Sequence, residues 1–204
     1  MFTQNTAYLS KRSWGYNQEA ALYASVPDAA SFDRLNAEML RDPNVLSIAG
    51  STHHLGKNYT TAIVHMPDRE YEVDQLSVDA NYFETLGLHL QQGRGFKDRS
   101  TSDKQAVVVN ELFVNTTTLK EPIEQQLKID STQYVIIGVV TDFHNNSFSN
   151  KVRPTIFRVA EKEDYRYLSI KVKSGTEQET FQALKGRWSE LFPETPFQGG
   201  FQED

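Results

Sequence analysis

The feature that most constrains the fold is a strand–helix–strand pattern near the start of the chain. Residues 20–26 form a short apolar run, and Pro27 and Asp28 then supply a break and a helix N-cap. The helix extends to about Arg41, and Pro43 ends it because proline cannot continue a helix. One apolar face of the helix is formed by Phe32, Leu35, Met39 and Leu40. Residues 45–49 resume as a strand, which completes the unit.

The same pattern recurs near the end of the chain. Residues 167–172 predict a strand, and residues 176–179 have the spacing of a helix capping box. An apolar helical stripe follows, formed by Phe181, Leu184, Trp188 and Leu191. Pro193 ends this helix, and residues 196–201 predict a closing strand. The two units together predict an α+β fold of ferredoxin-like type, with helices on one face of a sheet.

The middle of the chain is rich in predicted strands. They cover residues 60–65, 71–78, 106–109, 126–129 and 133–140, with one short helix at 81–86. The first two would be neighbouring strands joined by a turn at residues 66–69, and the last two a hairpin around residues 130–132. This block predicts a smaller β-rich subdomain inserted into the first one. Residues 15–80 and 152–204 would form the α+β subdomain, and residues 81–151 the inserted subdomain.

Charge and composition exclude several classes of protein. The chain has 27 acidic and 21 basic residues, and the basic ones are not clustered as they are in proteins that bind nucleic acid. It contains no cysteine, so disulfide bonds and cysteine metal sites are excluded. The longest apolar run covers about residues 134–140, whereas a membrane-spanning helix needs roughly 20 residues. The polar start also lacks the pattern of a secretory signal peptide.

No reactive motif is complete. Residues 50–58 follow a strand as a phosphate-binding loop would, but five residues separate the two glycines where that loop has four, and Asn58 stands where a hydroxyl is needed. His53 and His54 are adjacent, so on a strand they would point to opposite faces and could not share a metal ion. No Gly-x-Ser-x-Gly nucleophile motif occurs. We therefore expect no catalytic residue, cofactor or metal.

Five segments occur in a recognisable order: residues 78–88 (VDANYFETLGL), 93–96 (GRGF), 106–111 (AVVVNE), 134–144 (YVIIGVVTDFH) and 153–157 (RPTIF). In this order they resemble the MacB-like periplasmic core domain of FtsX-like ABC transporter permeases. Residues 15–19 and 191–197 are similar to the versions in Bacteroidetes-type permeases. One departure is Glu124, which stands where that family usually has glycine.

The resemblance implies a non-catalytic domain on the periplasmic side of the bacterial inner membrane, between the first and second spanning helices of a permease. It implies a porter-like α+β subdomain with a smaller β-rich one. The expected partners are a cognate ABC ATPase, reached through the membrane helices, and a periplasmic protein or exported substrate. ATP would be hydrolysed by the ATPase, and the parent permease would be dimeric.

Two loops are the candidates for a partner-facing surface, because loops carry function on rigid scaffolds. One contains His53, His54 and Leu55, and the other contains Asn146, Ser147 and Phe148. The alternative from another class is a stand-alone periplasmic ligand-binding or metal-dependent hydrolytic domain. It would use the polar loop of residues 51–59 with His53 and His54.

Overall fold

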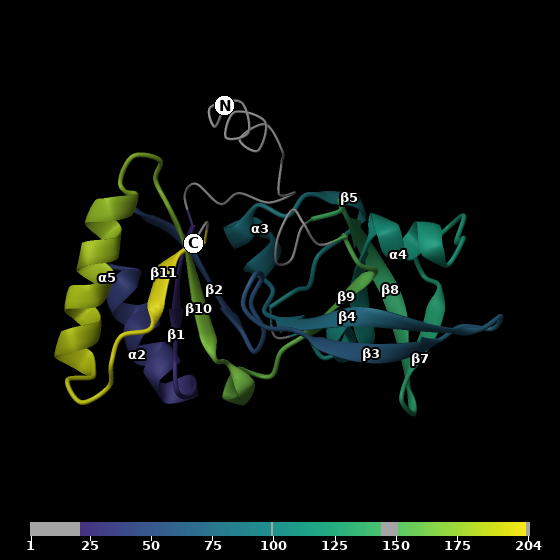
Figure 1. Cartoon of the computed structure of the whole chain (residues 1–204), viewed down its shortest axis with the longest axis horizontal. Coiled ribbons are helices and arrows are strands. Elements are labelled where there is room, and N and C mark those ends of the chain that lie inside the picture. Colours follow the sequence, from purple (N-terminus) through teal and green to yellow (C-terminus); the bar gives the residue numbers. More distant parts are fainter. Residues whose placement is uncertain (1–20, 99, 144–150, 203–204) are drawn as a thin grey trace, which may run out of the picture.

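The computed structural model describes residues 21–98, 100–143 and 151–202, which form two lobes joined by one mixed sheet (Figure 1). Eleven strands pair within these residues, in the order β11-β1-β10-β2-β4-β3-β7-β8-β6-β9, with β5 beside β8. The predicted α+β class is confirmed. The longest helix described has 15 residues, and no helix in the described ranges has the length and apolar character to cross a membrane.

The ferredoxin-like lobe is built from the two ends of the described chain. Its strands are β1 (Ala21–Ser25), β2 (Val45–Ser51), β10 (Tyr167–Val172) and β11 (Gly199–Phe201), and its helices are α2 (Ala29–Met39) and α5 (Glu177–Leu191). The pairings β11–β1, β1–β10 and β10–β2 are all antiparallel. Each strand of one βαβ unit therefore pairs with a strand of the other, and the predicted ferredoxin-like layer is confirmed.

Helix α2 begins and packs as its sequence predicts. The Asp28 carboxylate accepts a hydrogen bond of 2.7 Å from Ser31 N, which satisfies one of the free N–H groups of the first turn. Phe32, Leu35 and Met39 are buried along one side of the helix. The predicted cap is confirmed, and so are three residues of the predicted apolar face. The fourth, Leu40, was predicted wrongly, because it lies at the C-cap and is exposed.

Helix α5 has its predicted apolar face but not its predicted capping box. Leu184 and Trp188 are buried in the core. The Thr176 hydroxyl donates to Lys173 O at 2.7 Å, and no side chain caps the helix. The capping box is wrong because Thr176 bonds to the preceding turn, a local alternative that threonine side chains offer the backbone.

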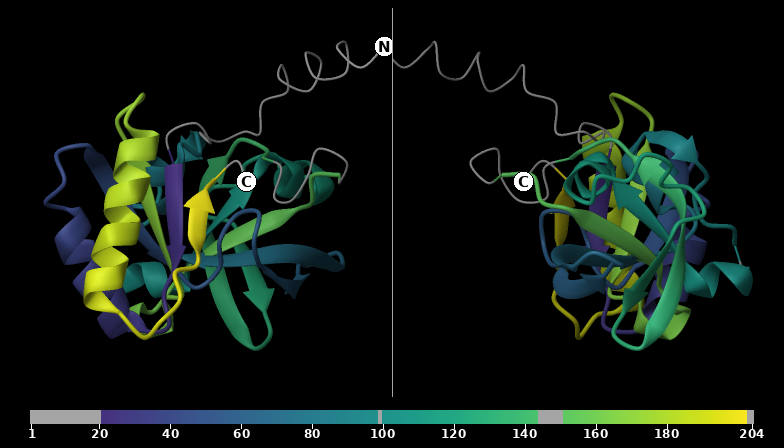
Figure 2. Two further views of the ribbon diagram at one scale, coloured as in Figure 1. Left: turned by 60° about the vertical axis from the view of Figure 1, so that its left-hand side comes forward. Right: turned by 90° about the vertical axis from the view of Figure 1, so that its right-hand side faces the viewer.

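Three helices sandwich the ferredoxin-like sheet. Helices α2 and α5 pack against each other and cover one face, as the left view of Figure 2 shows. The opposite face carries α3 (Tyr82–Leu86), which contacts β2 and β10. Two hydrophobic clusters result, one that includes Leu35 and Trp188 and another that includes Ala49 and Tyr82. The second cluster continues into the other lobe, where it includes Phe157.

The second lobe contains the remaining strands. These are β3 (Thr60–His65), β4 (Glu70–Val78), β5 (Leu90–Gly93), β6 (Ala106–Asn110), β7 (Gln126–Ile129), β8 (Thr132–Val140) and β9 (Thr155–Val159), with α4 (Glu111–Thr116) and the short 3-10 helix η1 (Ser102–Gln105). A second 3-10 helix, η2 (Lys162–Asp164), lies in the connection between β9 and β10 and contacts α2 and β2 of the ferredoxin-like lobe. The predicted pairing of β3 with β4 and the hairpin of β7 and β8 are confirmed. Strand β5 was not predicted, because its sequence LQQG is short and polar and its pairing with β8 is long-range.

The boundary between the two subdomains stays a prediction, and strand pairing favours a larger inserted part. Strand β4 pairs with β9, and β3 pairs with β7. Only one pair, Ser51 and Val78, links β4 to β2. Residues 60–78 and 155–159 thus share their backbone hydrogen bonds with the second lobe, although the predicted boundaries at 80 and 152 assign them to the first.

The turn before β7 has a strained backbone. Glu124 has a φ of 68°, in the left-handed region that favours glycine. Its N–H donates to Ile136 O at 2.8 Å, which holds the turn against β8. The position where the resembled family usually has glycine therefore keeps the glycine conformation with a glutamate.

Substitution of the strained residue provides the first prediction. Glu124→Gly should raise the free energy of unfolding by up to about 1 kcal/mol, because relief of the left-handed strain exceeds the entropy that glycine adds to the unfolded chain. Urea denaturation measures this change. The control Glu121→Gly, in the same connection but without a positive φ, should be destabilising. Destabilisation of equal size in both variants would contradict the assignment of strain.

A second prediction concerns the core of the ferredoxin-like lobe. Trp188 is 2% exposed, its ring centroid lies 4.7 Å from that of Phe192, and its indole N–H donates to Thr195 O at 2.7 Å. Trp188→Ala should lower the free energy of unfolding by about 3–5 kcal/mol, measured by chemical denaturation. Leu40→Ala, at a residue that is 58% exposed, should change it by less than about 0.5 kcal/mol. A similar loss of unfolding free energy in both variants would contradict the placement of Trp188 in the core.

Candidate functional site

The loop after β2 holds three of the residues predicted to face a partner. His54 and Leu55 are each 0% exposed, so their side chains belong to the core and not to the accessible surface. The loop folds inward because His54 forms a buried hydrogen bond with Gln202. Local sequence does not predict this bond, since Gln202 lies 148 residues further along the chain. His53 is half-buried, and its Nδ1 accepts from Ser77 N at 3.0 Å. A role of His53 in partner binding stays a prediction.

His54 is the centre of a buried polar cluster that we call the His54 cluster, formed by His54, Tyr82, Ser169 and Gln202. The ring Nε2 lies 2.5 Å from Gln202 Oε1, and Nδ1 lies 3.2 Å from Ser169 Oγ and 3.3 Å from the Tyr82 hydroxyl. Gln202 Nε2 donates to Leu55 O at 2.9 Å, which orients the amide. Since Gln202 Oε1 can only accept, the imidazole proton is on Nε2 and Nδ1 accepts.

The His54 ring is neutral and structural. Burial lowers the pKa of His54 to about 4, and the charge of Lys57 acts in the same direction, while the bond to Gln202 opposes the shift. The imidazole also stacks on the ring of Tyr167, with centroids 5.4 Å apart. Because protein groups engage both ring nitrogens, the ring has no free lone pair with which to hold a metal ion.

The second partner-facing loop cannot be placed, and the described residues give no support to the alternative of a metal-dependent hydrolase. Asn146, Ser147 and Phe148 lie outside the described residues, and their predicted role stays a prediction. Over the ranges that the structure describes, no group of three His, Asp or Glu side chains is arranged to hold a metal ion. His53 and His54 bond to different elements, as their separate partners show.

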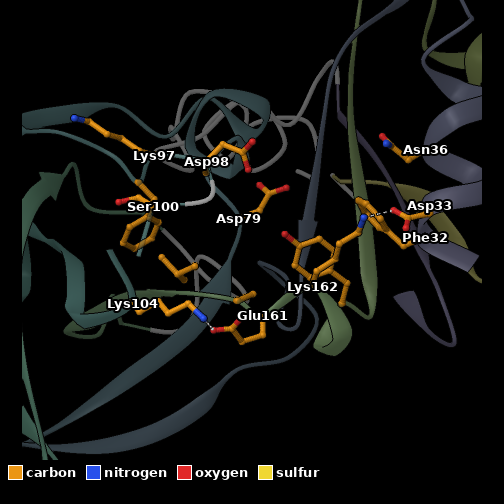
Figure 3. Close-up of a pocket in the computed structure, with 15 residues that line it drawn as sticks. Phe32, Asp33, Asn36, Asp79, Lys97, Asp98, Ser100, Lys104, Glu161 and Lys162 are labelled. Carbon is orange, nitrogen blue, oxygen red and sulfur yellow. Dashed lines mark ion pairs between the residues drawn. The ribbon is translucent and has the colours of Figure 1, made fainter. Parts of the chain in front are cut away.

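A cavity of about 330 Å³ lies between the two lobes (Figure 3), and sequence analysis did not predict it. Its described walls come from α2, from residues 79–80 after β4, from the loop segments of residues 96–98 and 100–104 and from the connection between β9 and β10. The four segments are distant in sequence, so no motif reveals the site. In the sequence, the lining residues are visible only as aromatic and charged side chains scattered over separate segments.

Asp79 lies in the wall of this cavity. Its two carboxylate oxygens accept hydrogen bonds from Gly50 N at 2.6 Å and from Asn81 N at 2.9 Å. Burial raises the pKa of Asp79 to about 7, and the negative charge of Asp98 adds to the rise, although the two N–H donors oppose it. The wall of the cavity therefore contains a carboxyl group, that of Asp79, which titrates near neutral pH.

Tyr165 forms part of the same wall, and its ring is the reason that residue 50 is a glycine. A Cβ atom on Gly50 would lie 2.1 Å from the Tyr165 ring, so only glycine lets the ring pack against β2. The ring also meets Phe32 edge-on, with centroids 4.9 Å apart. The glycine that suggested a phosphate loop thus serves the packing of an aromatic wall.

Ion pairs fix the segments around the cavity. Lys104 Nζ lies 2.9 Å from Glu161 Oε1, which ties the second lobe to the connection between β9 and β10. Lys162 Nζ lies 2.7 Å from Asp33 Oδ1, which ties that connection to α2. Both pairs are solvent-exposed, so each contributes little to stability on its own. Together they span the opening from one lobe to the other.

The loop segments of residues 96–98 and 100–104 are held in place by a buried acid. Asp103 is 1% exposed and accepts two hydrogen bonds from the Arg94 guanidinium, at 2.7 and 2.9 Å. It also accepts from Lys97 N at 2.7 Å. The bidentate pair keeps the pKa of Asp103 below its usual value. This arrangement positions Phe96 and Asp98 at the cavity.

The two ends of the described chain lie side by side. Leu22 pairs with Phe201 across β1 and β11, and Gln202 N donates to Ala21 O at 2.9 Å. The chain therefore enters β1 and leaves β11 at the same end of these two adjacent strands. The His54 cluster sits directly at this exit, because Gln202 belongs to both features.

Comparison with known proteins assigns the sequence to a family model. The model described as "MacB-like periplasmic core domain" matches residues 2–185. A search of curated protein sequences gives no match.

Solved structures with this fold include three domains of membrane proteins. The periplasmic region of MacB from Actinobacillus actinomycetemcomitans has a TM-score of 0.63 and 14% identity, with 93% of this chain and 91% of that chain covered. The extracellular domain of the noncanonic ABC-type transporter YknZ from Gram-positive bacteria has a TM-score of 0.62 and 12% identity, with 89% and 98% covered. A domain of a putative permease from Porphyromonas gingivalis has a TM-score of 0.58 and 14% identity, with 89% of each covered.

The buried histidine provides a prediction on pH. The pKa of His54 is about 4 in the folded chain and 6.5 in the unfolded one, so between these values only the unfolded chain holds the proton. Stability should therefore fall with pH from 6.5 to 4, by about 3 kcal/mol from this group. Asp79 acts oppositely in nearly the same range, because its folded pKa is raised from 3.8 to about 7. The difference between wild type and His54→Gln cancels the Asp79 contribution.

Urea denaturation at several pH values measures that difference. The stability advantage of wild type over His54→Gln should shrink as pH falls from 6.5 to 4. Gln133→Asn, at an exposed position of β8 without a titratable side chain, is the control and should keep the wild-type pH profile. A difference curve for His54→Gln that is flat with pH would show that the ring is not held neutral.

Proposed function

The chain belongs to the MacB-like periplasmic core domain family, and from that premise we propose that it is the extracytoplasmic domain of an ABC transporter permease, without catalytic activity of its own. It stands on the outer side of the cytoplasmic membrane between two spanning helices of the parent permease. There it transmits motion driven by ATP hydrolysis in a separate ATPase, and it binds a periplasmic protein or an exported substrate.

The observation that carries this proposal is the position of the chain ends. Ala21 and Gln202 are joined by a backbone hydrogen bond of 2.9 Å, and the strands next to them pair in register. A domain inserted between two consecutive membrane helices must have its entry and exit on one side. Ends on opposite faces would not suit that position.

The His54 cluster supports a role in transmitting motion. Gln202 bonds the loop after β2 through His54 and Leu55, so a displacement of the exit segment acts on this loop. His53 in turn bonds Ser77 of β4, which belongs to the second lobe. A continuous series of bonds therefore leads from the chain exit to the far lobe. The buried bonds of the His54 cluster move as one unit because breaking any of them leaves an unsatisfied polar group in the core.

A dimeric parent permease permits a direct test in the full transporter, with its ATPase bound. A spin label at Gln182→Cys, an exposed position on α5, reports the distance between the two protomers. This chain has no native cysteine, so the label is specific within it. The distance distribution, measured by pulsed electron paramagnetic resonance, should differ between the ATP-trapped and ADP-bound states.

An internal pair of labels provides the matched control. Ala37→Cys on α2 with Gln182→Cys on α5 should give one distance in both nucleotide states, because the two helices share one core. Equal distances between protomers in both states would contradict the transmission of motion. A changed distance within the control pair would contradict a rigid ferredoxin-like lobe.

A further inference from the structure

At the junction between the two lobes, a side chain takes the place of strand pairing. Within the described ranges, strands β2 and β4 share one residue pair, Ser51 with Val78. The next residue, Asp79, continues the contact. Its N–H donates to Gly50 O at 2.9 Å, and its carboxyl group accepts from Gly50 N at 2.6 Å. Both backbone groups of Gly50 are therefore bonded to one residue, and one of the two bonds depends on a titratable group.

The same carboxyl group fixes the entry into α3. Its second oxygen accepts from Asn81 N at 2.9 Å, and the Asn81 side chain donates to Ile48 O at 3.3 Å. Helix α3 then contacts β2 and β10 of the ferredoxin-like lobe, whereas Asp79 directly follows β4 of the second lobe. The Asp79 carboxyl group thus lies where the chain passes from one lobe to the other, and its bonds hold both sides.

Two titratable groups on the cavity side interact with Asp79. Burial raises the pKa of Asp79 to about 7, and the charge of Asp98, which Figure 3 shows next to it, adds to the rise. Burial also raises the pKa of Tyr165, and the charge of Asp79 raises it further, so the Tyr165 hydroxyl stays neutral at physiological pH. Asp79 is therefore the group here that changes charge near neutral pH.

The other charged groups around the junction are accounted for. Those that line the cavity are Lys97 and the two ion pairs Lys104–Glu161 and Lys162–Asp33. Strand β2 has no titratable side chain from Val45 to Ser51. Helix α3 has two, the exposed Glu84 and Tyr82, whose hydroxyl belongs to the His54 cluster.

A carboxyl group in this position couples proton binding to the packing of the junction. When the junction opens, water reaches Asp79 and its pKa returns toward 3.8. The packed state then holds the proton more tightly than the opened state, so a fall in pH favours packing and a rise favours opening. A protonated carboxyl group keeps lone pairs that can accept from both N–H donors, so protonation does not break the contact.

From this geometry we propose that Asp79 is a proton-dependent latch between the two lobes, which packs firmly when its carboxyl group is protonated and opens more readily when the group is ionised. The latch goes beyond the proposed transmission of motion, because it determines how firmly the second lobe follows the first. It is a property of the folded chain and does not depend on the membrane setting.

Hydrogen exchange of the purified chain at pH 6 and pH 8 tests the latch, measured for each amide by NMR and corrected for intrinsic exchange rates. The opening equilibrium constants of the Gly50 and Asp79 amides should be about tenfold larger at pH 8 than at pH 6, as linkage to a pKa of about 7 requires. These amides should also open at a lower free energy than Val108 in the core of β6, because the junction opens without global unfolding.

Neutral replacements of the latch residue provide the comparison. Asp79→Asn and Asp79→Ser remove the titrating group, and the serine hydroxyl can still accept from Asn81 N. Both variants should lose the tenfold rise. Glu84→Gln is the matched control, since it removes an exposed carboxyl group from the neighbouring helix, and it should keep the rise. In the wild type, the chemical shift of the Gly50 amide should titrate with a midpoint near pH 7, a measurement that needs no variant.

Four results would overturn the inference. They are opening constants of Gly50 and Asp79 that do not change with pH, a rise that persists in both neutral variants, opening free energies equal to that of Val108, and a midpoint of the Gly50 titration below pH 5.

Discussion

The structure depends above all on the pairing of β1 with β10 and β11, which brings the first described strand between two strands from the end of the chain. Such pairing closes a very long loop, whose entropy must be offset by the core that α2 and α5 bury against the sheet. Once it forms, the ends of the chain are adjacent. The second lobe is then an insertion whose two connections, after β2 and before β10, start from neighbouring strands. The adjacency of the described chain ends, which the proposed position within a permease requires, follows from this one pairing.

The local elements were largely predictable because their signals lie within a few residues. The Asp28 cap, the apolar faces of α2 and α5 and the strands on both sides of the turn at Met66 all follow from neighbouring side chains. Signals of the same length failed in two places, once because a nearby backbone group competed and once because the partner strand is distant. Thr176 fits a capping box in sequence, yet its hydroxyl bonds to the preceding turn. Strand β5 exists only because β8 lies beside it.

The candidate site was less predictable for the same reason. A loop with two histidines in a polar stretch is typical of an exposed surface, but the partner of His54 lies 148 residues away and buries the ring. The cavity joins four segments whose proximity no single segment encodes. Gly50 shows most clearly what local sequence cannot predict. Its neighbours suggested a phosphate-binding loop, whereas a glycine is needed there because the ring of Tyr165 packs against it. Family resemblance was informative because it carries the long-range arrangement that local patterns lack.

Native-state hydrogen exchange tests most directly whether the chain exit and the core form one mechanical unit. The amides of Leu55 and Gln202, both hydrogen-bonded within the His54 cluster or beside it, should exchange only through the same opening that exposes β10. Their free energies of exchange should then equal those of Ser169 and Ile170 in that strand. Exchange of Gln202 and Leu55 at a free energy near zero, while β10 stays protected, would show that the exit segment moves independently and would contradict the account.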